Sequence, residues 1–316
     1  MTTSAPSIDI DAYLARIGLQ RDALTAGVSL TQLATIVAHH SRAIPFENLA
    51  GCGVFPVVHA TNGEVVSLRL VDIVQKLVYD KRGGYCFEQN GLLAAVLRGL
   101  GYAVATHSAR VVMANNDPEK PAYDLSGLSH AILVVDATDG NGDVAKYLCD
   151  VGFGGRGQPP CPMRLLPGME SRVDVAHGER YELAAVALTH QWTASEFSGS
   201  FVLAKAPVAG DHMAVYYRTG KDKPMFPSYV FSTSIATTQA DYAMANWYCS
   251  ASPLSFLAQQ PLVVRRSGTT LLTLTANQFT KYEAGVVVET QTIDDKDVLL
   301  ALLATSFGLT PTTKCA

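Results

Sequence analysis

A single cysteine stands at the start of a long apolar helical pattern, directly after two glycines. Residues 82–90 read Arg-Gly-Gly-Tyr-Cys-Phe-Glu-Gln-Asn, and leucines and valines then recur at helical spacing as far as Gly101. The pattern predicts that Cys86 lies at a helix N-terminus, where unpaired N–H groups and the helix dipole favour a thiolate. Most free cysteines are buried and inert, but the two glycines allow a sharp turn that presents this one to a substrate. We therefore interpret Cys86 as a nucleophile.

A nucleophilic cysteine needs a base, and the base needs a group that orients it. Of the eight histidines, His130 is the one that opens an apolar run typical of a buried strand, at 131–135. On its own it would be read as an ordinary strand-end histidine. However, Asp150 closes the next short strand pattern, and a turn with the sequence Asp-Gly-Asn-Gly-Asp lies between the two at 139–143. A hairpin with this turn places His130 beside Asp150.

Four motifs, taken together and in this order, resemble those of the arylamine N-acetyltransferase family. They are Ile44–Leu49, Arg82–Glu88, Ser126–His130 and Asp150–Gly154. A later segment, Asn246–Phe256, is similar to the start of the last domain of that family, so the resemblance covers nearly the whole chain. It implies that Cys86 accepts the acyl group, that His130 is the base and that Asp150 orients the imidazole.

The resemblance also implies an α+β fold with a cysteine-protease-like Cys-His-Asp core. Residues 1–101 would form a helical bundle that carries the nucleophile, residues 102–218 a β-barrel that carries the histidine and the aspartate, and residues 219–316 an α/β lid. The patterns agree, because helical spacing with Ser67 as one N-cap gives way to strand patterns after about Leu100. The strands expected from the sequence are Tyr102–Val112, His130–Asp136, Tyr147–Asp150, Tyr181–Leu188, Gln191–Glu196, Ala214–Arg218, Leu262–Arg266, Thr270–Thr275 and Val286–Thr290, with helices at Ala236–Trp247 and Lys296–Phe307.

The activity implied by the resemblance is acetyl transfer from acetyl-CoA to an aromatic amine or hydrazine, in two steps through an acyl-cysteine. Acetyl-CoA would be a co-substrate, and no metal is implied. By family position, three phenylalanines would wall the acceptor pocket and three small residues would contact the acyl-CoA. Taken alone, each aromatic would be read as ordinary core. The pocket residues are Phe46, Phe87 and Phe153, and the acyl-CoA contacts are Ser126, Gly127 and Gly152.

Charged residues inside these motifs have a structural interpretation. We predict that Arg82 and Glu47 form a buried ion pair that fixes the nucleophile loop, so that loss of either partner would damage folding. Glu88 is predicted to be a first-turn acid that favours the helix dipole, or to secure a neighbouring loop. The segment 115–121 is predicted to be a surface insertion at the rim of the pocket.

Composition excludes several classes of protein. A chain of 316 residues with 48% hydrophobic residues is not disordered, and its net charge of −4 makes nucleic acid a poor partner. No apolar stretch is long enough to cross a membrane, and the six cysteines show neither paired nor metal-type spacing. We therefore expect a cytoplasmic enzyme, monomeric or homodimeric, without a metal, a nucleic acid or a membrane partner. The glycine-rich run at 152–157 lacks the pattern of a nucleotide-binding loop.

Other interpretations stay open at this point. An amide-forming acyltransferase with a different acyl donor would carry the same three residues, because their chemistry is indifferent to acyl length. A Cys-His-Asp hydrolase shares the same residue order. A non-enzymatic binding module requires an unreactive Cys86.

Overall fold

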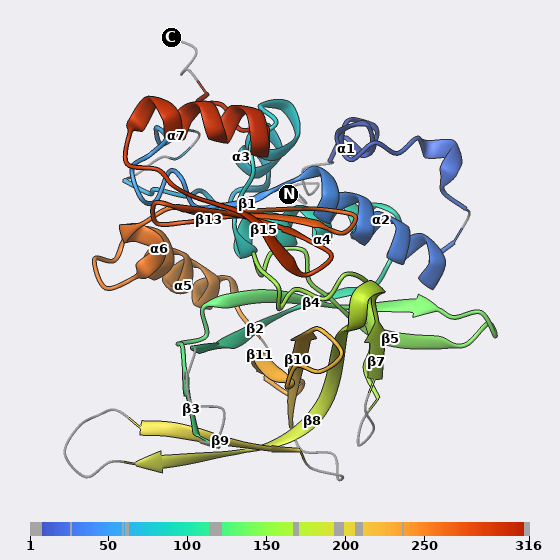
Figure 1. Ribbon diagram of the computed structural model, residues 1–316. Helices are drawn as coiled ribbons and strands as arrows, with labels where there is room; N and C mark the ends of the chain where they lie inside the picture. Colours follow the sequence, from blue (N-terminus) through green and yellow to red (C-terminus); the bar gives the residue numbers. More distant parts are fainter. Residues whose placement is uncertain are drawn as a thin grey trace.

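The chain folds into a helical bundle, a sheet that closes on itself and a second, smaller sheet (Figure 1), as the predicted α+β fold requires. The structure is a computed structural model, and it describes residues 8–25, 27–58, 60, 63–113, 122–166, 171–192, 199–205, 211–235 and 237–312. The segment 115–121, predicted to be a surface insertion, lies outside these residues.

Four helices form the N-terminal bundle. Asp9 and Ser29 cap the first two, since each side chain accepts a hydrogen bond from a backbone N–H of the first turn. Ser67 does not cap the third, contrary to the prediction, because that helix begins after Arg69; the Ser67 hydroxyl donates instead to Asp72, at 2.5 Å. The helices are α1 (Ile10–Arg16), α2 (Leu30–Ala43), α3 (Leu70–Val74), which continues as a wider turn over Gln75–Tyr79, and α4 (Cys86–Gly99).

Within the described residues the larger sheet has ten strands, and its path returns to its own start. Strand β11 pairs with β10 on one side and with β2 on the other, which closes the barrel. The strands are β2 (Val104–Met113), β3 (Ala122–Leu125), β4 (His130–Thr138), β5 (Val144–Cys149), β6 (Met163–Arg164), β7 (Ser171–Asp174), β8 (Glu179–Trp192), β9 (Gly199–Lys205), β10 (His212–Thr219) and β11 (Phe226–Ser232).

The strand predictions for the barrel need correction, and strands β3, β6, β7 and β9 were not predicted. Residues 191 and 192 belong to the single long strand β8 and do not start a new strand; the remainder of the predicted strand, 193–196, lies outside the described residues. Strand β11 was not predicted, and it lies beyond residue 218, where the barrel was expected to end. The barrel sheet therefore extends to Ser232.

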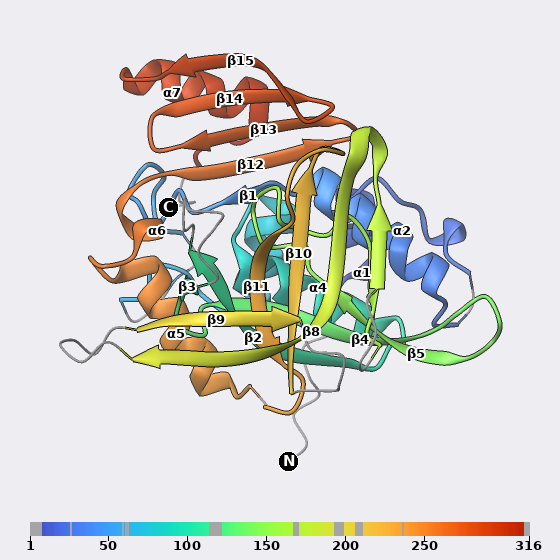
Figure 2. The same ribbon diagram turned by 60° about the horizontal axis from the view of Figure 1, so that its bottom comes forward.

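The smaller sheet is antiparallel in the order β1-β12-β13-β14-β15, and β14 was not predicted. Helix α7 lies over one face of it (Figure 1), and Figure 2 shows its strands side by side above the barrel. Its first strand, β1, comes from the N-terminal third of the chain. The smaller sheet is therefore connected to the region of the nucleophile through this strand. The elements are β1 (Phe46–Glu47), α5 (Gln239–Ala251), α6 (Phe256–Gln259), β12 (Leu262–Ser267), β13 (Thr270–Thr275), β14 (Gln278–Glu283), β15 (Val286–Thr292) and α7 (Lys296–Leu302).

Strand β4 joins the bundle to the barrel. Leu133 and Val135 pack into the core that contains α1, α2 and α4, whereas Ile132 points into the core of the barrel. This alternation follows from the two-residue period of a strand. Because both faces are buried, the register of β4 is fixed, and so is the position of His130 at its start.

Candidate active site

Cys86 is the first residue of α4, as predicted. The turn before it is held by the carboxylate of Glu88, which accepts a hydrogen bond from the backbone N–H of Tyr85 at 3.2 Å. The turn also packs tightly, since a side chain on Gly83 would place its Cβ 2.3 Å from the carbonyl oxygen of Pro45. A glycine at 83 is therefore required for the backbone to bring Cys86 to this place.

The predicted hairpin is confirmed. Strands β4 and β5 pair antiparallel with Leu133 opposite Cys149, which brings the start of one beside the end of the other. His130 Nε2 lies 2.8 Å from Asp150 Oδ2, and both side chains are buried. The other ring nitrogen, Nδ1, is thereby left for Cys86, and the neighbouring imidazole favours ionisation of that thiol.

Asn90 fixes the aspartate, and the sequence analysis missed it. It lies one helical turn after Cys86 on the same face of α4. Its Nδ2 donates to Asp150 Oδ1 at 3.0 Å and to the carbonyl oxygen of Ala131 at 2.7 Å, and its Oδ1 accepts from Val151 N. The spacing of four residues from the cysteine was the available signal.

Tyr229 is a second residue that the sequence analysis missed, since it lies on the unpredicted strand β11. Its ring is 5.0 Å from the imidazole of His130 and 5.4 Å from the ring of Phe153. Burial and the Asp150 carboxylate, to which the hydroxyl is directed, raise the pKa of Tyr229. Among the described residues its hydroxyl has no hydrogen bond of good geometry.

The three titratable groups act on one another. Burial works against ionisation of both His130 and Asp150, but their attraction prevails: the pKa of Asp150 lies below its usual value and that of His130 rises to about 10. Burial raises the pKa of the Cys86 thiol, and the neighbouring His130 imidazole only partly offsets this. The helix N-terminus was expected to lower the pKa of the Cys86 thiol, but in the folded protein this pKa is raised. The imidazolium remains the group that stabilises a thiolate here.

The raised pKa of His130 predicts a pH-dependent stability. The unfolded chain releases this proton near pH 6.5 and the folded chain near pH 10, so the stabilisation is fully present below 6.5 and is lost as the pH rises through 10. We expect the difference in unfolding free energy between wild type and His130→Gln to shrink across that window. Urea unfolding of both proteins over the pH range measures it. A difference that stays constant from neutral to alkaline pH would contradict the assignment.

The predicted aromatic residues gather around the nucleophile. Phe46 and Phe87 pack in one apolar cluster with Cys86, and Phe153 meets the His130 ring edge to face, with centroids 5.3 Å apart. A Cβ on Gly154 would come within 2.4 Å of the Phe46 ring, so this glycine lets the aromatic lie flat against the loop.

The residues predicted to contact acyl-CoA lie in two different settings. Ser126 is half-buried in the loop before β4, where its hydroxyl accepts from Val111 N and donates to the carbonyl of Gly127. Gly127 itself is exposed, with open space where a side chain would be. Gly152 is buried, and a Cβ there would lie 2.6 Å from Cys86 Cα. Any larger residue at this position would therefore clash with the backbone of Cys86.

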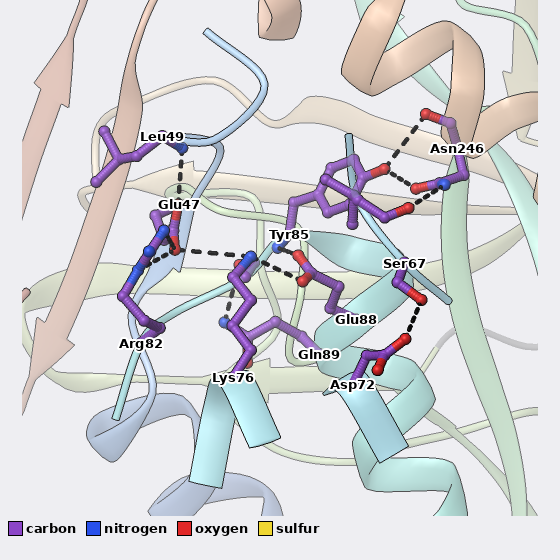
Figure 3. Close-up of polar contacts among 12 residues, drawn as sticks. Glu47, Leu49, Ser67, Asp72, Lys76, Arg82, Tyr85, Glu88, Gln89 and Asn246 are labelled. Carbon is purple, nitrogen blue, oxygen red and sulfur yellow. Dashed lines mark hydrogen bonds and ion pairs between the residues drawn. The ribbon is translucent and has the colours of Figure 1, made fainter. Parts of the chain in front are cut away.

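The nucleophile loop rests on a buried ionic network, shown in Figure 3. Arg82 Nη2 lies 2.7 Å from Glu47 Oε1, and Lys76 Nζ lies 2.7 Å from Glu88 Oε1 and 3.7 Å from Glu47 Oε1. Glu47 Oε2 also accepts from Leu49 N at 2.7 Å. The predicted ion pair of Arg82 and Glu47 is thus confirmed, and Glu88 secures both Lys76 and the turn before Cys86.

Two features of the described residues bear on possible partners. No group of three or more His, Cys, Asp or Glu side chains is arranged to hold a metal ion there. Within the same ranges, every helix is too short or too polar to span a bilayer.

Both the sequence and the fold are similar to those of known proteins. A family model described as N-acetyltransferase matches residues 29–315. The arylamine N-acetyltransferase of Escherichia coli (strain K12) is 30% identical over 306 residues, which are 95% of this chain and 88% of the relative. The solved arylamine N-acetyltransferase from Salmonella typhimurium superposes with a TM-score of 0.73 at 28% identity, over 97% of this chain and 93% of that one.

A third comparison includes a ligand. The structure of the Mycobacterium marinum arylamine N-acetyltransferase in complex with CoA superposes with a TM-score of 0.70 at 26% identity, over 95% of this chain and 92% of that one. The site thus belongs to a protein of the N-acetyltransferase class. The chain is a member of the arylamine N-acetyltransferase family, as its motifs indicated.

Proposed function

We propose that this protein transfers an acetyl group from acetyl-CoA to an aromatic amine or hydrazine through an acyl-Cys86 intermediate. The observation that carries the proposal is that Cys86, at the start of α4, lies near enough to His130 for the imidazole to favour its thiolate, and that His130 is itself paired with Asp150 at 2.8 Å, in a chain of this family. The relative solved in complex with CoA supports the choice of donor.

In the first half of the reaction, the Cys86 sulfur attacks the thioester carbonyl and CoA leaves as the thiol, with the proton that His130 supplies. In the second half, the amine attacks the acyl carbon, His130 takes the amine proton and the Cys86 sulfur leaves. Asp150 holds the imidazole with Nδ1 toward the sulfur. The tetrahedral oxyanion needs N–H donors, for which we propose the backbone N–H groups of Cys86 and Ala131.

For the acceptor we propose a pocket beside the nucleophile loop. Its atom-free space is about 760 Å³, and Phe46, Val151, Gly154, Val264 and Leu271 are among its lining residues. Phe46 also belongs to the cluster that contains Cys86, so this residue is shared by the pocket and the surroundings of the nucleophile. We propose that Phe87, which lies in the same cluster as Cys86, and Phe153, which lies beside His130, form apolar walls nearer to the sulfur. On the donor side, we propose that the exposed loop at Ser126 and Gly127, with Gly152 beneath Cys86, guides the pantetheine arm.

The proposal extends to the organisation of the protein. We propose a bundle over residues 1–101, a barrel whose last strand ends at Ser232, and a lid over the remainder. We also propose that the enzyme acts in the cytoplasm as a monomer or homodimer, without a metal, a nucleic acid or a membrane partner.

The test is the intact mass of the purified protein after brief mixing with acetyl-CoA, beside Cys86→Ala, with an aromatic amine added afterwards. We expect one acetyl group on the wild type alone, and its removal by the amine. Loss of the acetyl group to water at the same rate without amine would instead indicate a hydrolase. Absence of any adduct with acetyl-CoA would overturn the proposal.

The hydroxyl of Tyr229 is buried beside Asp150, and we propose that it donates a hydrogen bond to this carboxylate during the reaction; Tyr229→Phe is therefore expected to slow Cys86 acetylation by up to about tenfold, the equivalent of one hydrogen bond. The rate is measured by stopping the acetylation at timed intervals and determining the intact mass of the protein. Tyr181→Phe is the matched control, because its hydroxyl donates to the carbonyl of Arg156 elsewhere in the barrel. Equal rates for the two variants would remove Tyr229 from the site.

A further inference from the structure

A second thiol lies beside the nucleophile. The sulfurs of Cys86 and Cys249 each lie 3.7 Å from the same atom, the carbonyl oxygen of Ser129. They can therefore be no further apart than twice that distance. Both cysteines are buried in one apolar cluster. An acyl group on Cys86 would extend into space that Cys249 borders.

Cys249 is part of a roof over the nucleophile. Helix α5 turns Tyr242, Asn246 and Cys249 inward, at the spacing of one helical face. The Tyr242 ring meets that of Phe87 edge to face at 5.5 Å.

Hydrogen bonds fix this roof. The hydroxyl of Tyr242 donates to the carbonyl of His107 at 3.0 Å, and Asn246 Nδ2 donates to the carbonyl of Val66 at 2.9 Å. Asn246 Oδ1 in turn accepts from the hydroxyl of Tyr85, the residue before the nucleophile. Because α5 is held at several points, it cannot shift aside cheaply for a larger acyl group.

A small cavity lies behind Cys249. Its walls are apolar at Val66 and Leu257 and charged at Glu47, Lys76 and Glu88, and it is large enough for about one water. Cys249 thus lines this cavity and also lies close to Cys86. Shortening its side chain would enlarge the cavity at the position nearest to the nucleophile.

We propose that Cys249 sets the upper limit on the length of the acyl group that Cys86 accepts: acetyl fits beneath its thiol, and a longer unbranched acyl chain collides with it. This inference rests on the proposed acyl-transfer function and names the donor selectivity of that site. Burial also raises the pKa of Cys249 to about 12, so the thiol stays protonated and acts as a wall without competing for the acyl group.

The experiment compares Cys86 acylation by acetyl-, propionyl- and butyryl-CoA, with rate constants from intact mass at timed quenches. In Cys249→Ala, the ratio of the butyryl to the acetyl rate is expected to rise about tenfold, the discrimination typical of a methylene or two in an apolar pocket. Cys249→Met fills the same space further and should lower the propionyl and butyryl rates relative to acetyl.

Met244→Ala is the matched control, because Met244 lies on the outer face of the same helix with 72% of its surface exposed. Its ratio is expected to equal that of the wild type. If Cys249→Ala and Cys249→Met both take up acetyl but keep the wild-type ratio to within about twofold, the inference is overturned while acyl transfer stands. If no acyl-CoA modifies the wild type, the proposed function fails and this inference fails with it.

Discussion

Asp150→Asn is expected to slow acetylation of Cys86 on the order of 10⁴-fold, although asparagine has nearly the same shape as aspartate. Asp150 Oδ1 accepts from Asn90 Nδ2 and from Gly152 N, so an asparagine would turn its own oxygen toward these two donors. Its NH₂ group would then face His130 Nε2. The imidazole would have to carry its proton on Nδ1, toward the sulfur, where it could not take the thiol proton.

Timed acetylation followed by intact mass measures this effect, with circular dichroism to show that the variant is folded. Asp136→Asn is the control, because the exposed pair of Asp136 and Lys146 lies at the other end of the β4–β5 hairpin. A loss of less than about tenfold in Asp150→Asn would mean that orientation of the imidazole is not what the aspartate supplies.

Arg82→Ala is expected to destabilise the protein by about 3–5 kcal/mol, because it leaves the carboxylate of Glu47 buried without its main partner. The side chains of Arg82 and Glu47 are 1% and 0% exposed, and the guanidinium also lies over the Phe55 ring at 4.4 Å from its centroid. Lys76 remains 3.7 Å from Glu47 but is already bound to Glu88. Urea unfolding measures the loss of stability.

The control for this loss is Arg21→Ala. Arg21 pairs with Asp11 at 2.5 Å, but their side chains are 56% and 71% exposed, so its removal should cost less than about 1 kcal/mol. The double variant Arg82→Met with Glu47→Leu keeps Lys76 and Glu88 paired, and it should lose less stability than the two single changes added together. Additive losses would show that the two side chains do not act as a unit.

The motifs predicted the parts of the site that lie close together in sequence or along one hairpin. The helix start at Cys86 and the pairing of His130 with Asp150 both follow from short-range patterns, glycines before an apolar helix and a turn between two strands. The buried ion pair could be predicted from the sequence for a similar reason, because a charge inside an apolar motif needs a partner.

Two of the residues that were missed, Tyr229 and Cys249, reach the site only through long-range packing. Tyr229 belongs to a strand whose place is set by pairing with β2, more than a hundred residues earlier. Cys249 meets the nucleophile only because α5 folds back over α4. No local period in the sequence encodes such contacts, since they depend on how the barrel closes.

The pKa of Cys86 shows another limit of sequence reasoning. A helix N-terminus lowers the pKa of a thiol, and this effect can be read from the chain, but the degree of burial cannot. In the folded protein burial is the largest influence on the thiol, so a correct local argument led to the wrong sign.

Closure of the barrel by β11, followed by α5, has a consequence for synthesis on the ribosome. Cys86 and its loop emerge long before Tyr229 and Cys249, which cover them from the last third of the chain. A nascent chain therefore carries an uncovered nucleophile until about residue 251 has left the exit tunnel. Protection of Cys86 from a thiol-alkylating reagent in stalled chains of increasing length would report when the fold is complete.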